Sequence, residues 1–360
     1  MKKTEKRMPL QSSHLTDTVA PLSAWYLENR RSLPWRDEPT PYHVWLSEVM
    51  LQQTRIAAVI PYYHRFLAAL PTVTALSEVE DEALMKLWEG LGYYSRARNL
   101  KAAAKRIVEE FGGELPADHK ALLSLPGIGE YTAGAIASIA FGLPEPAVDG
   151  NVLRVIMRLC DCHADITLPE TKKQVTEALR EIYPRGEGAG ILTQAIMELG
   201  ENVCIPNGQP RCIDCPLSPY CAALAANTVD ELPKKTPKKP RRIEQKTVLL
   251  MEYEGAYALR QRPEEGLLAG LWEFPSAEGT LAPEAVAALL RTWGGEAASC
   301  EPIGHAVHVF THVEWHMTGY RVICKTPPRG VTLATPHQLT RQYAIPRAFS
   351  YFVKLCLETK

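Results

Sequence analysis

The sequence lacks any apolar run long enough to cross a bilayer, which takes about 20 consecutive apolar residues. Its N-terminal stretch, MKKTEKRMPLQSSHL, is basic but lacks the apolar segment of a secretory signal peptide. Both absences argue against a membrane or secreted protein, and we expect a cytoplasmic location.

An excess of charge of one sign is also missing, since 40 Lys and Arg residues stand against 41 Asp and Glu residues. A balanced total still allows a local basic face, so it neither supports nor excludes nucleic-acid binding. The 46% of hydrophobic and 22% of charged residues are those of a globular protein. A chain of 360 residues is long enough for two or three domains.

Cysteine is scattered except in one stretch. Of nine Cys residues, four follow the spacing Cys-x7-Cys-x2-Cys-x5-Cys: Cys204, Cys212, Cys215 and Cys221. An odd, clustered set without a secretion signal indicates a metal centre rather than disulfides. Zinc and an iron–sulfur cluster both suit four thiolates. Structural zinc sites usually show two tight Cys pairs and this loop has one, so the spacing favours a [4Fe–4S] cluster.

Strand-like alternation is absent before about residue 240, and helical periodicity predicts an all-α domain over residues 21–228. A flexible arm is expected at residues 1–20. Residues 229–245 include the basic, Pro-rich run ELPKKTPKKPRR and are expected to form an extended linker.

The periodicity changes beyond the linker. Residues 247–262 predict a hairpin that turns at Glu254-Gly255, and residues 284–293 predict a helix between further strands. Residues 246–360 are therefore expected to form a separate α+β domain.

The stretch LPGIGEYT, residues 125–132, joins two predicted helices, at 117–124 and 131–141. Gly127 and Gly129 would let backbone N–H groups converge on an anion, because glycine tolerates positive φ and adds no side chain. Such a turn suits contact with a phosphate without base preference. Taken alone, it fits an ordinary helix–helix connection equally well.

Glu48 lies in the middle of a predicted helix at residues 42–54, preceded by a segment expected to be extended, Leu33–Arg36. Val44, Glu48 and Leu51 recur at helical spacing, so the carboxyl group shares a face with apolar side chains. Burial raises the pKa of a carboxyl group, which suits a general acid at neutral pH. The alternative is a buried Glu that pairs with an Arg for structural reasons.

Residues 87–98, LWEGLGYYSRAR, interrupt a helical pattern with two glycines and place tyrosines beside arginines. Aromatic side chains next to basic ones can enter a base stack. A packing corner between helices is the commoner explanation of such a pattern.

Together these motifs resemble the helix-hairpin-helix DNA glycosylases, and within them the adenine-excising branch of the MutY type. LPGIGEYTAGAI is similar to the family hairpin, WLSEVMLQQT to the segment with its acid, and VDGNVLRV to the segment with its catalytic Asp. EGLGYYSRARNL and the four-Cys loop also occur in the family's order. The resemblance covers residues 25–225 strongly and the C-terminal domain more weakly.

The resemblance implies that Glu48 and Asp149 form the catalytic pair, oriented by Tyr131 and Asn151. Protonated Glu48 would donate to N7 of adenine, and ionised Asp149 would stabilise an oxocarbenium-like sugar, as paired carboxylates do in glycoside hydrolysis. Taken alone, Asp149 is also a good N-cap for the next helix. Further contacts with the base or DNA are implied for Trp35, Arg36, Leu51, Gln53, Tyr93, Gly127, Gly129 and Gln194.

The related endonuclease III-like enzymes carry in their hairpin a Lys that forms a Schiff base and cleaves the strand. This chain has Tyr131 at the equivalent place, and a phenol cannot form an imine, so a monofunctional glycosylase is expected. One departure concerns the first Cys spacing, which is seven residues where the family usually has six. Asn207-Gly208 offers a turn that can absorb the extra residue.

The C-terminal domain resembles the Nudix-like module of the same family. Its candidate helix, residues 285–293, lacks the carboxylates that hold Mg²⁺ in Nudix hydrolases, so we expect binding without hydrolysis. Phe310, Thr311 and His312 stand where the family has a Phe-Ser-His loop, which implies recognition of 8-oxoguanine. An ordinary β-turn is the alternative for these three residues.

The resemblance thus implies a monomeric, nucleoid-associated repair glycosylase that flips adenine out of duplex DNA at an A:8-oxoguanine or A:G mispair. Its [4Fe–4S] cluster would be structural or would position DNA. Two other functions stay open: an endonuclease III-like glycosylase and lyase for damaged pyrimidines, and a non-catalytic iron–sulfur protein that binds mismatches. The pairing of Glu48 with Asp149 argues against the second.

Overall fold

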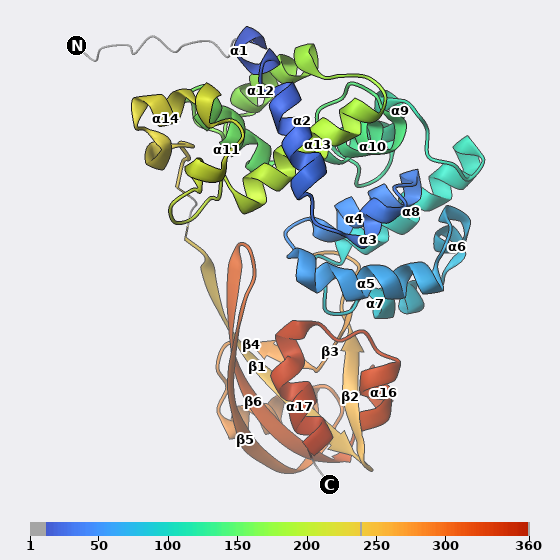
Figure 1. Ribbon diagram of the computed structural model, residues 1–360. Coiled ribbons are helices and arrows are strands. Elements are labelled where there is room, and N and C mark those ends of the chain that lie inside the picture. Colours follow the sequence, from blue (N-terminus) through green and yellow to red (C-terminus); the bar gives the residue numbers. More distant parts are fainter. Residues whose placement is uncertain (1–11, 238–239, 359–360) are drawn as a thin grey trace. The chain divides into compact units, whose positions relative to one another are not determined.

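The structure is a computed structural model that describes residues 12–237 and 240–358 (Figure 1). The chain divides into two compact units. Unit 1 comprises Met1–Glu78 and Arg98–Pro237, and unit 2 comprises Val79–Ala97 and Lys238–Lys360. Within the described residues, no helix has both the length and the apolar character needed to cross a bilayer.

The described part of unit 1 is all-α, as the sequence predicts. Three short turns of 3-10 helix, η1 to η3, follow the last long helix, α13. The elements are α1 Ser12–Thr16, α2 Val19–Asn29, α3 Pro34–Asp37, α4 Pro41–Leu51, α5 Ile56–Ala69, α6 Val73–Glu78, α8 Ser95–Phe111 (which begins in unit 2), α9 His119–Ser124, α10 Glu130–Phe141, α11 Gly150–Leu159, α12 Pro169–Ile182, α13 Glu187–Asn202, η1 Cys212–Asp214, η2 Ser218–Tyr220, α14 Ala222–Ala226 and η3 Val229–Glu231.

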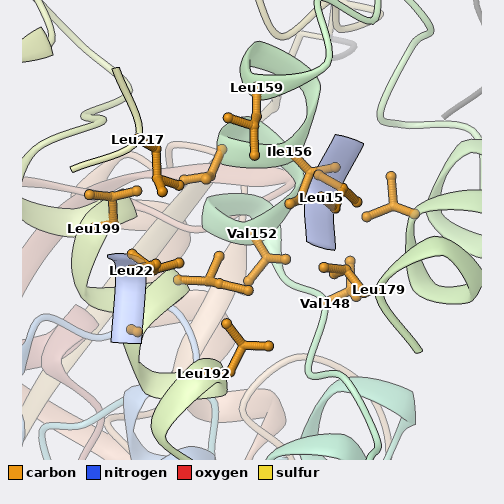
Figure 2. Close-up of a cluster of buried hydrophobic side chains, with 14 of the residues drawn as sticks. Leu15, Leu22, Val148, Val152, Ile156, Leu159, Leu179, Leu192, Leu199 and Leu217 are labelled. Atoms are coloured by element: carbon orange, nitrogen blue, oxygen red, sulfur yellow. The ribbon is translucent and has the colours of Figure 1, made fainter. Parts of the chain in front are cut away.

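An apolar core holds the helices that carry the candidate site. Figure 2 shows Leu15 of α1 and Leu22 of α2 together with Val152 of α11 and with Leu192 and Leu199 of α13. Each of these side chains is at most 2% exposed. Burying one such side chain contributes about 1.5–3 kcal/mol, so the core fixes α11 firmly against α13.

The hairpin predicted at residues 125–132 forms between α9 and α10. Gly127 has a φ of +75°, and a Cβ at this position would lie 2.6 Å from the Cβ of Asn99, so the turn requires glycine. Gly129 is different. Its φ is −97°, and it serves as the N-cap of α10 without using the left-handed region.

Several elements differ from the sequence-based expectations. The Leu33–Arg36 segment is not extended, because α3 begins at Pro34, whose fixed φ suits the first position of a helix. Helix α4 ends at Leu51 rather than at residue 54, since Gln53 has a φ of +57°. Residues 1–11 of the expected arm lie outside the described residues, and from Ser12 onward the chain is helical.

Unit 2 combines α7 with a mixed sheet and three further helices, as expected for an α+β domain. The hairpin predicted around Glu254-Gly255 is present between the first two strands. The elements are α7 Asp81–Trp88, β1 Arg242–Tyr253, β2 Ala256–Gln261, β3 Trp272–Glu273, β4 Ser276–Glu278, α15 Pro283–Thr292, β5 Glu296–Val309, β6 Val313–Thr326, β7 Thr332–Ala334, α16 Pro336–Arg341, η4 Arg347–Phe349 and α17 Ser350–Glu358. The expected linker is therefore short, because η3 and β1 occupy its two ends.

The sheet order is β3-β2-β1-β6-β5, with β4 paired to β1 and β7 paired to β2. Strands β1 and β6 are parallel, whereas β5 and β6 form an antiparallel pair joined by the turn of residues 310–312. Trp315 packs with Phe352 of α17 in one core, and Leu249 packs with Leu290 of α15 in another. Helices thus cover parts of both faces of the sheet.

Candidate active site

A pocket of about 130 Å³ in unit 1, here called the acid pocket, gathers predicted residues from separate elements. They come from α3, α4, α10, the N-terminal end of α11, and α13, which span more than 150 positions of the chain. The predicted residues that line it are Trp35, Arg36, Glu48, Leu51, Tyr131, Asp149, Asn151 and Gln194.

Glu48 sits in the third turn of α4, a helix capped by Thr40, whose side chain accepts a hydrogen bond from the His43 amide. The Glu48 residue is only 7% exposed. Burial raises its pKa to about 7, and the nearby Asp149 carboxylate adds to the rise, whereas a hydrogen bond from Tyr131 and the charge of Arg36 oppose it. A carboxyl group in this state is poised to give up a proton near neutral pH.

Tyr131 is the hydrogen-bond partner of this acid. Its hydroxyl donates to Oε2 of Glu48 over 2.6 Å. Burial, followed by the charges of Glu48 and Asp149, raises the pKa of the Tyr131 phenol well above its usual value. The phenol therefore stays protonated and acts as a fixed donor in the pocket.

Asp149 caps α11 and faces the acid pocket at the same time. Its Oδ1 accepts from the amides of Asn151 and Val152, both over 2.8 Å, and its Oδ2 accepts from Nδ2 of Asn151 over 3.0 Å. Burial raises the pKa of Asp149, while these donors and the Arg154 guanidinium oppose the rise. The capping role and a place in the pocket thus coexist.

The side chain of Asn151 is itself held by a hydrogen bond from Arg154. Its Oδ1 accepts from Arg154 over 2.9 Å, and Arg154 also donates to the carbonyls of Gly200 and Cys204. Helix α13 approaches very closely here, since a Cβ at Gly200 would lie 2.9 Å from the Cβ of Asn151. The amide that holds Asp149 is therefore fixed by two neighbouring segments.

Gln194 lines the acid pocket with its amide already engaged. Its Oε1 accepts from the Tyr26 hydroxyl over 3.0 Å, and its Nε2 donates to the Gly190 carbonyl over 3.3 Å. Both bonds fix the orientation of the amide. A ligand that uses the same atoms must share or replace these partners.

Glu198 and Arg31 also line this pocket, although no motif in the sequence pointed to them. Glu198 is fully buried and forms ion pairs with Arg31 at 2.5 Å and with Arg36 at 2.8 Å. Burial pushes its pKa up, but hydrogen bonds from the two arginines lower it below the usual value. The spacing of Gln194, Glu198 and Glu201 on one face of α13 was the signal available in the sequence.

Other predicted site residues lie outside the acid pocket. Gln53 and Tyr93 both adopt a positive φ, +57° and +47°, which is uncommon for residues other than glycine. Gly127 and Gly129 lie in the hairpin turn. Phe310, Thr311 and His312 form the turn between β5 and β6 in unit 2, where the Phe310 ring packs edge-on against Trp315.

The four predicted cysteine ligands line one small pocket of about 30 Å³, together with Arg158. The Arg158 guanidinium donates to Sγ of Cys204 over 3.3 Å and to the Ile205 carbonyl over 3.1 Å. A cationic donor beside the sulfurs is suited to thiolate ligands. In the described part of the chain, no three His, Cys, Asp or Glu side chains are arranged as ligands of a metal ion.

Family models match both parts of the chain. Residues 46–185 match the HhH-GPD superfamily base excision DNA repair protein, and residues 247–355 match a NUDIX domain. Two solved structures have the fold of the helical part. A thermostable thymine-DNA glycosylase is 26% identical with a TM-score of 0.53, and covers 59% of this chain and 98% of its own. Endonuclease III trapped in a covalent intermediate with DNA is also 26% identical, with a TM-score of 0.51, and covers 60% and 98%.

Fold and site thus define a base excision repair protein of the HhH-GPD class. Adenine DNA glycosylase of Mus musculus is 36% identical over 84% of this chain and 71% of its own length. The Homo sapiens enzyme is 37% identical over 85% and 68%, and the enzyme of Buchnera aphidicola subsp. Schizaphis graminum is 33% identical over 70% and 72%. The chain belongs to the adenine DNA glycosylase family.

Proposed function

We propose that this adenine-specific DNA N-glycosylase hydrolyses the bond between adenine and deoxyribose where adenine is mispaired with 8-oxoguanine or guanine in duplex DNA. We further propose that it is monofunctional and leaves the strand uncut. The observation that carries the proposal is the acid pocket. It holds Glu48, whose pKa is raised to about 7, together with Asp149, whose carboxyl group caps α11.

The first chemical task is to make adenine a better leaving group. Glu48 is protonated below about pH 7 and donates its proton to N7 of the flipped base. The Tyr131 hydroxyl holds one carboxyl oxygen, Oε2, so the other is available to carry that proton. Tyr131 itself cannot form an imine with the sugar, which supports hydrolysis without a lyase step.

The second task is to stabilise positive charge on the sugar as the bond breaks. Asp149 accepts three hydrogen bonds, from two backbone amides and the Asn151 side chain, and these favour its ionised form. An ionised carboxylate stabilises an oxocarbenium-like sugar, as in glycoside hydrolysis. The two carboxyl groups thus take the roles of acid and electrostatic stabiliser.

Base extrusion and recognition fall to the remaining residues. Trp35, Arg36 and Leu51 line the pocket for the flipped base, and the Gln194 amide is suited to an edge of adenine. Gln53 and Tyr93 are our candidates for entering the base stack. The Gly127–Gly129 turn suits a phosphate contact.

In unit 2, we assign recognition of 8-oxoguanine to Phe310, Thr311 and His312. The Phe310 amide donates to the Val313 carbonyl over 2.8 Å, which closes the turn. Thr311 and His312 are exposed. A hydroxyl and an imidazole on a supported turn can read polar groups on a base edge.

Cys204, Cys212, Cys215 and Cys221 are the proposed ligands of a [4Fe–4S] cluster. Their shared pocket and the adjacent Arg158 suit thiolate ligands, and their spacing favours the cluster over zinc. When bound, such a cluster would stiffen the loop after α13. We also propose that the protein is a monomer and that it is cytoplasmic and associated with the nucleoid.

The test is to incubate the purified protein with duplexes that carry adenine opposite 8-oxoguanine, guanine or thymine, and to analyse the adenine strand with and without alkali. Cleavage only after alkali, confined to the first two duplexes, is the expected result. Strand scission without alkali would indicate lyase chemistry instead. Absence of any product from cluster-containing protein would contradict a glycosylase function.

A further inference from the structure

The segment Val79–Ala97 lies inside the stretch that matches the glycosylase family, yet it belongs to unit 2. Two side chains attach this segment to the rest of unit 2: Lys86 in α7, and Glu89, which caps the C-terminal end of the helix. Lys86 donates through Nζ to the Tyr343 carbonyl over 3.0 Å, and Oε1 of Glu89 accepts from the Ile345 amide over 2.9 Å. The same two side chains form an ion pair of 2.7 Å between Nζ and Oε2.

These two hydrogen bonds lie on one side of the segment Tyr343–Ile345. The opposite edge is used by the Trp272 amide of β3, which donates to the Ala344 carbonyl over 3.2 Å. In an extended chain, the carbonyl of one residue and the amide of the second residue after it point to the same side. Lys86 and Glu89 therefore bind the segment as a neighbouring strand would. We call these two residues the clamp pair.

The loop after the clamp pair is tightly held. Gly90 and Gly92 have φ values of +95° and +73°. The Trp88 indole donates to the Gly92 carbonyl over 3.0 Å, and the Arg96 guanidinium donates to the carbonyls of Leu91 and Gly92. These bonds restrain the loop that connects Glu89 to Tyr93.

Tyr93 in turn lies against the recognition turn. Its hydroxyl is 3.0 Å from Oγ1 of Thr311, within hydrogen-bonding distance. Tyr93 is 44% exposed, so its ring remains accessible to DNA. The residue proposed to enter the base stack and the hydroxyl proposed to read 8-oxoguanine are therefore adjacent in one unit.

We propose that Lys86 and Glu89 are positioning residues for lesion discrimination. By binding the Tyr343–Ile345 backbone, the clamp pair holds Tyr93 beside Thr311, so that stack entry and reading of the opposite base take place at one point. Neither clamp residue is among those that line the acid pocket, so we expect the chemical step not to depend on them. This role rests on the proposed recognition of 8-oxoguanine by unit 2.

The test compares single-turnover excision of adenine opposite 8-oxoguanine and opposite guanine. Glu89→Ala removes both the acceptor of the Ile345 amide and the partner of Lys86, so we expect the ratio of the two rates to fall about tenfold, as for loss of a hydrogen bond to a charged group. Lys86→Met should lower the ratio similarly. Glu89→Gln keeps an oxygen acceptor and should restore much of it.

Three further experiments isolate the clamp. Glu177→Ala breaks a surface ion pair with Lys173 on α12 and should leave the ratio unchanged. Hydrogen–deuterium exchange should increase at residues 79–97 and 343–345 in Glu89→Ala, but not in α10 or α11. In a Thr311→Val background, Glu89→Ala should cause no further loss of the ratio, because the hydroxyl beside which the clamp pair holds Tyr93 is gone.

The outcomes separate this inference from the function on which it rests. Wild-type protein that excises both adenines equally would overturn recognition of 8-oxoguanine and the clamp's role in it. A wild-type preference that survives in both Glu89→Ala and Lys86→Met would overturn the clamp alone. Should Glu89→Ala fail to fold, Lys86→Met decides the question, because an unchanged ratio in that variant would overturn the clamp.

Discussion

Two buried glutamates stand on separate helices around the acid pocket and are tuned in opposite directions. Glu48 on α4 is 7% exposed and Glu198 on α13 is 0% exposed, so burial alone would raise the pKa of both. Glu48 accepts from the neutral Tyr131 hydroxyl, and its pKa rises to about 7. Glu198 accepts from Arg31 and Arg36, and its pKa falls below the usual value.

The hydrogen-bond partners of the two carboxyl groups differ in charge, and this difference accounts for the opposite directions of their pKa shifts. Cationic partners fix Glu198 as a carboxylate that balances Arg31 and Arg36. A neutral partner leaves Glu48 able to hold a proton at neutral pH. One glutamate organises the wall of the pocket while the other is available for chemistry.

The largest effect should follow from Glu48→Gln, which keeps the shape of the side chain but removes the transferable proton. We expect single-turnover excision to fall by about 10³-fold, the order of a lost general acid. Binding to mismatched duplex, measured by fluorescence anisotropy, should change little. Excision at the wild-type rate would contradict the acid assignment.

Asp149→Asn should also reduce excision by about 10²-fold or more, because the developing charge on the sugar loses its stabilising carboxylate. Asparagine can still cap α11 through its side-chain oxygen, so thermal stability should hold within about 1 kcal/mol. Rapid-quench assays and thermal unfolding together separate the two roles. A loss of stability with normal chemistry in the folded fraction would leave only the cap.

Glu198→Ala tests the other glutamate of the pocket, whose partners are Arg31 and Arg36. Removing the carboxylate leaves two arginines without their buried partner, which should destabilise the fold by about 3 kcal/mol. Denaturant unfolding measures this, with Glu177→Ala on the surface as the matched control. The freed charge of Arg36 should also lower the pKa of Glu48, so activity should decline at a lower pH than in the wild type.

The smallest effect is expected for Tyr131→Phe. The tyrosine hydrogen bond opposes the rise in the pKa of Glu48, so its loss should move that pKa further up. The pH at which excision declines should shift upward accordingly, while its maximum falls. A downward shift would contradict the role of Tyr131 as a donor to the carboxyl group.

Much of the fold is readable from the sequence, because the signals are local. The helical period of unit 1, the change to strands after the linker, and the turn at Glu254-Gly255 each depend on neighbouring residues. The misassigned Leu33–Arg36 segment shows the limit. The segment was expected to be extended, whereas Pro34 in fact starts a short helix.

Site residues that belong to a recognisable motif could be predicted from the sequence. Contacts between residues far apart in the chain could not be predicted. Glu48, Tyr131 and Asp149 follow from their motifs, and the structure places them in one pocket. Arg31 and Glu198 lie 167 positions apart, so only the folded chain shows their ion pair. The same holds for the Glu89–Ile345 contact, which joins residues 256 positions apart.

The most direct test of the central claim is the pH dependence of single-turnover excision in the wild-type protein. With the pKa of Glu48 raised to about 7, the acid stays protonated up to neutral pH. Under saturating enzyme, the rate should therefore decline about tenfold per pH unit above that point. A rate that stays constant from about pH 6 to 9, or that rises through neutrality, would contradict a protonated Glu48 as the acid.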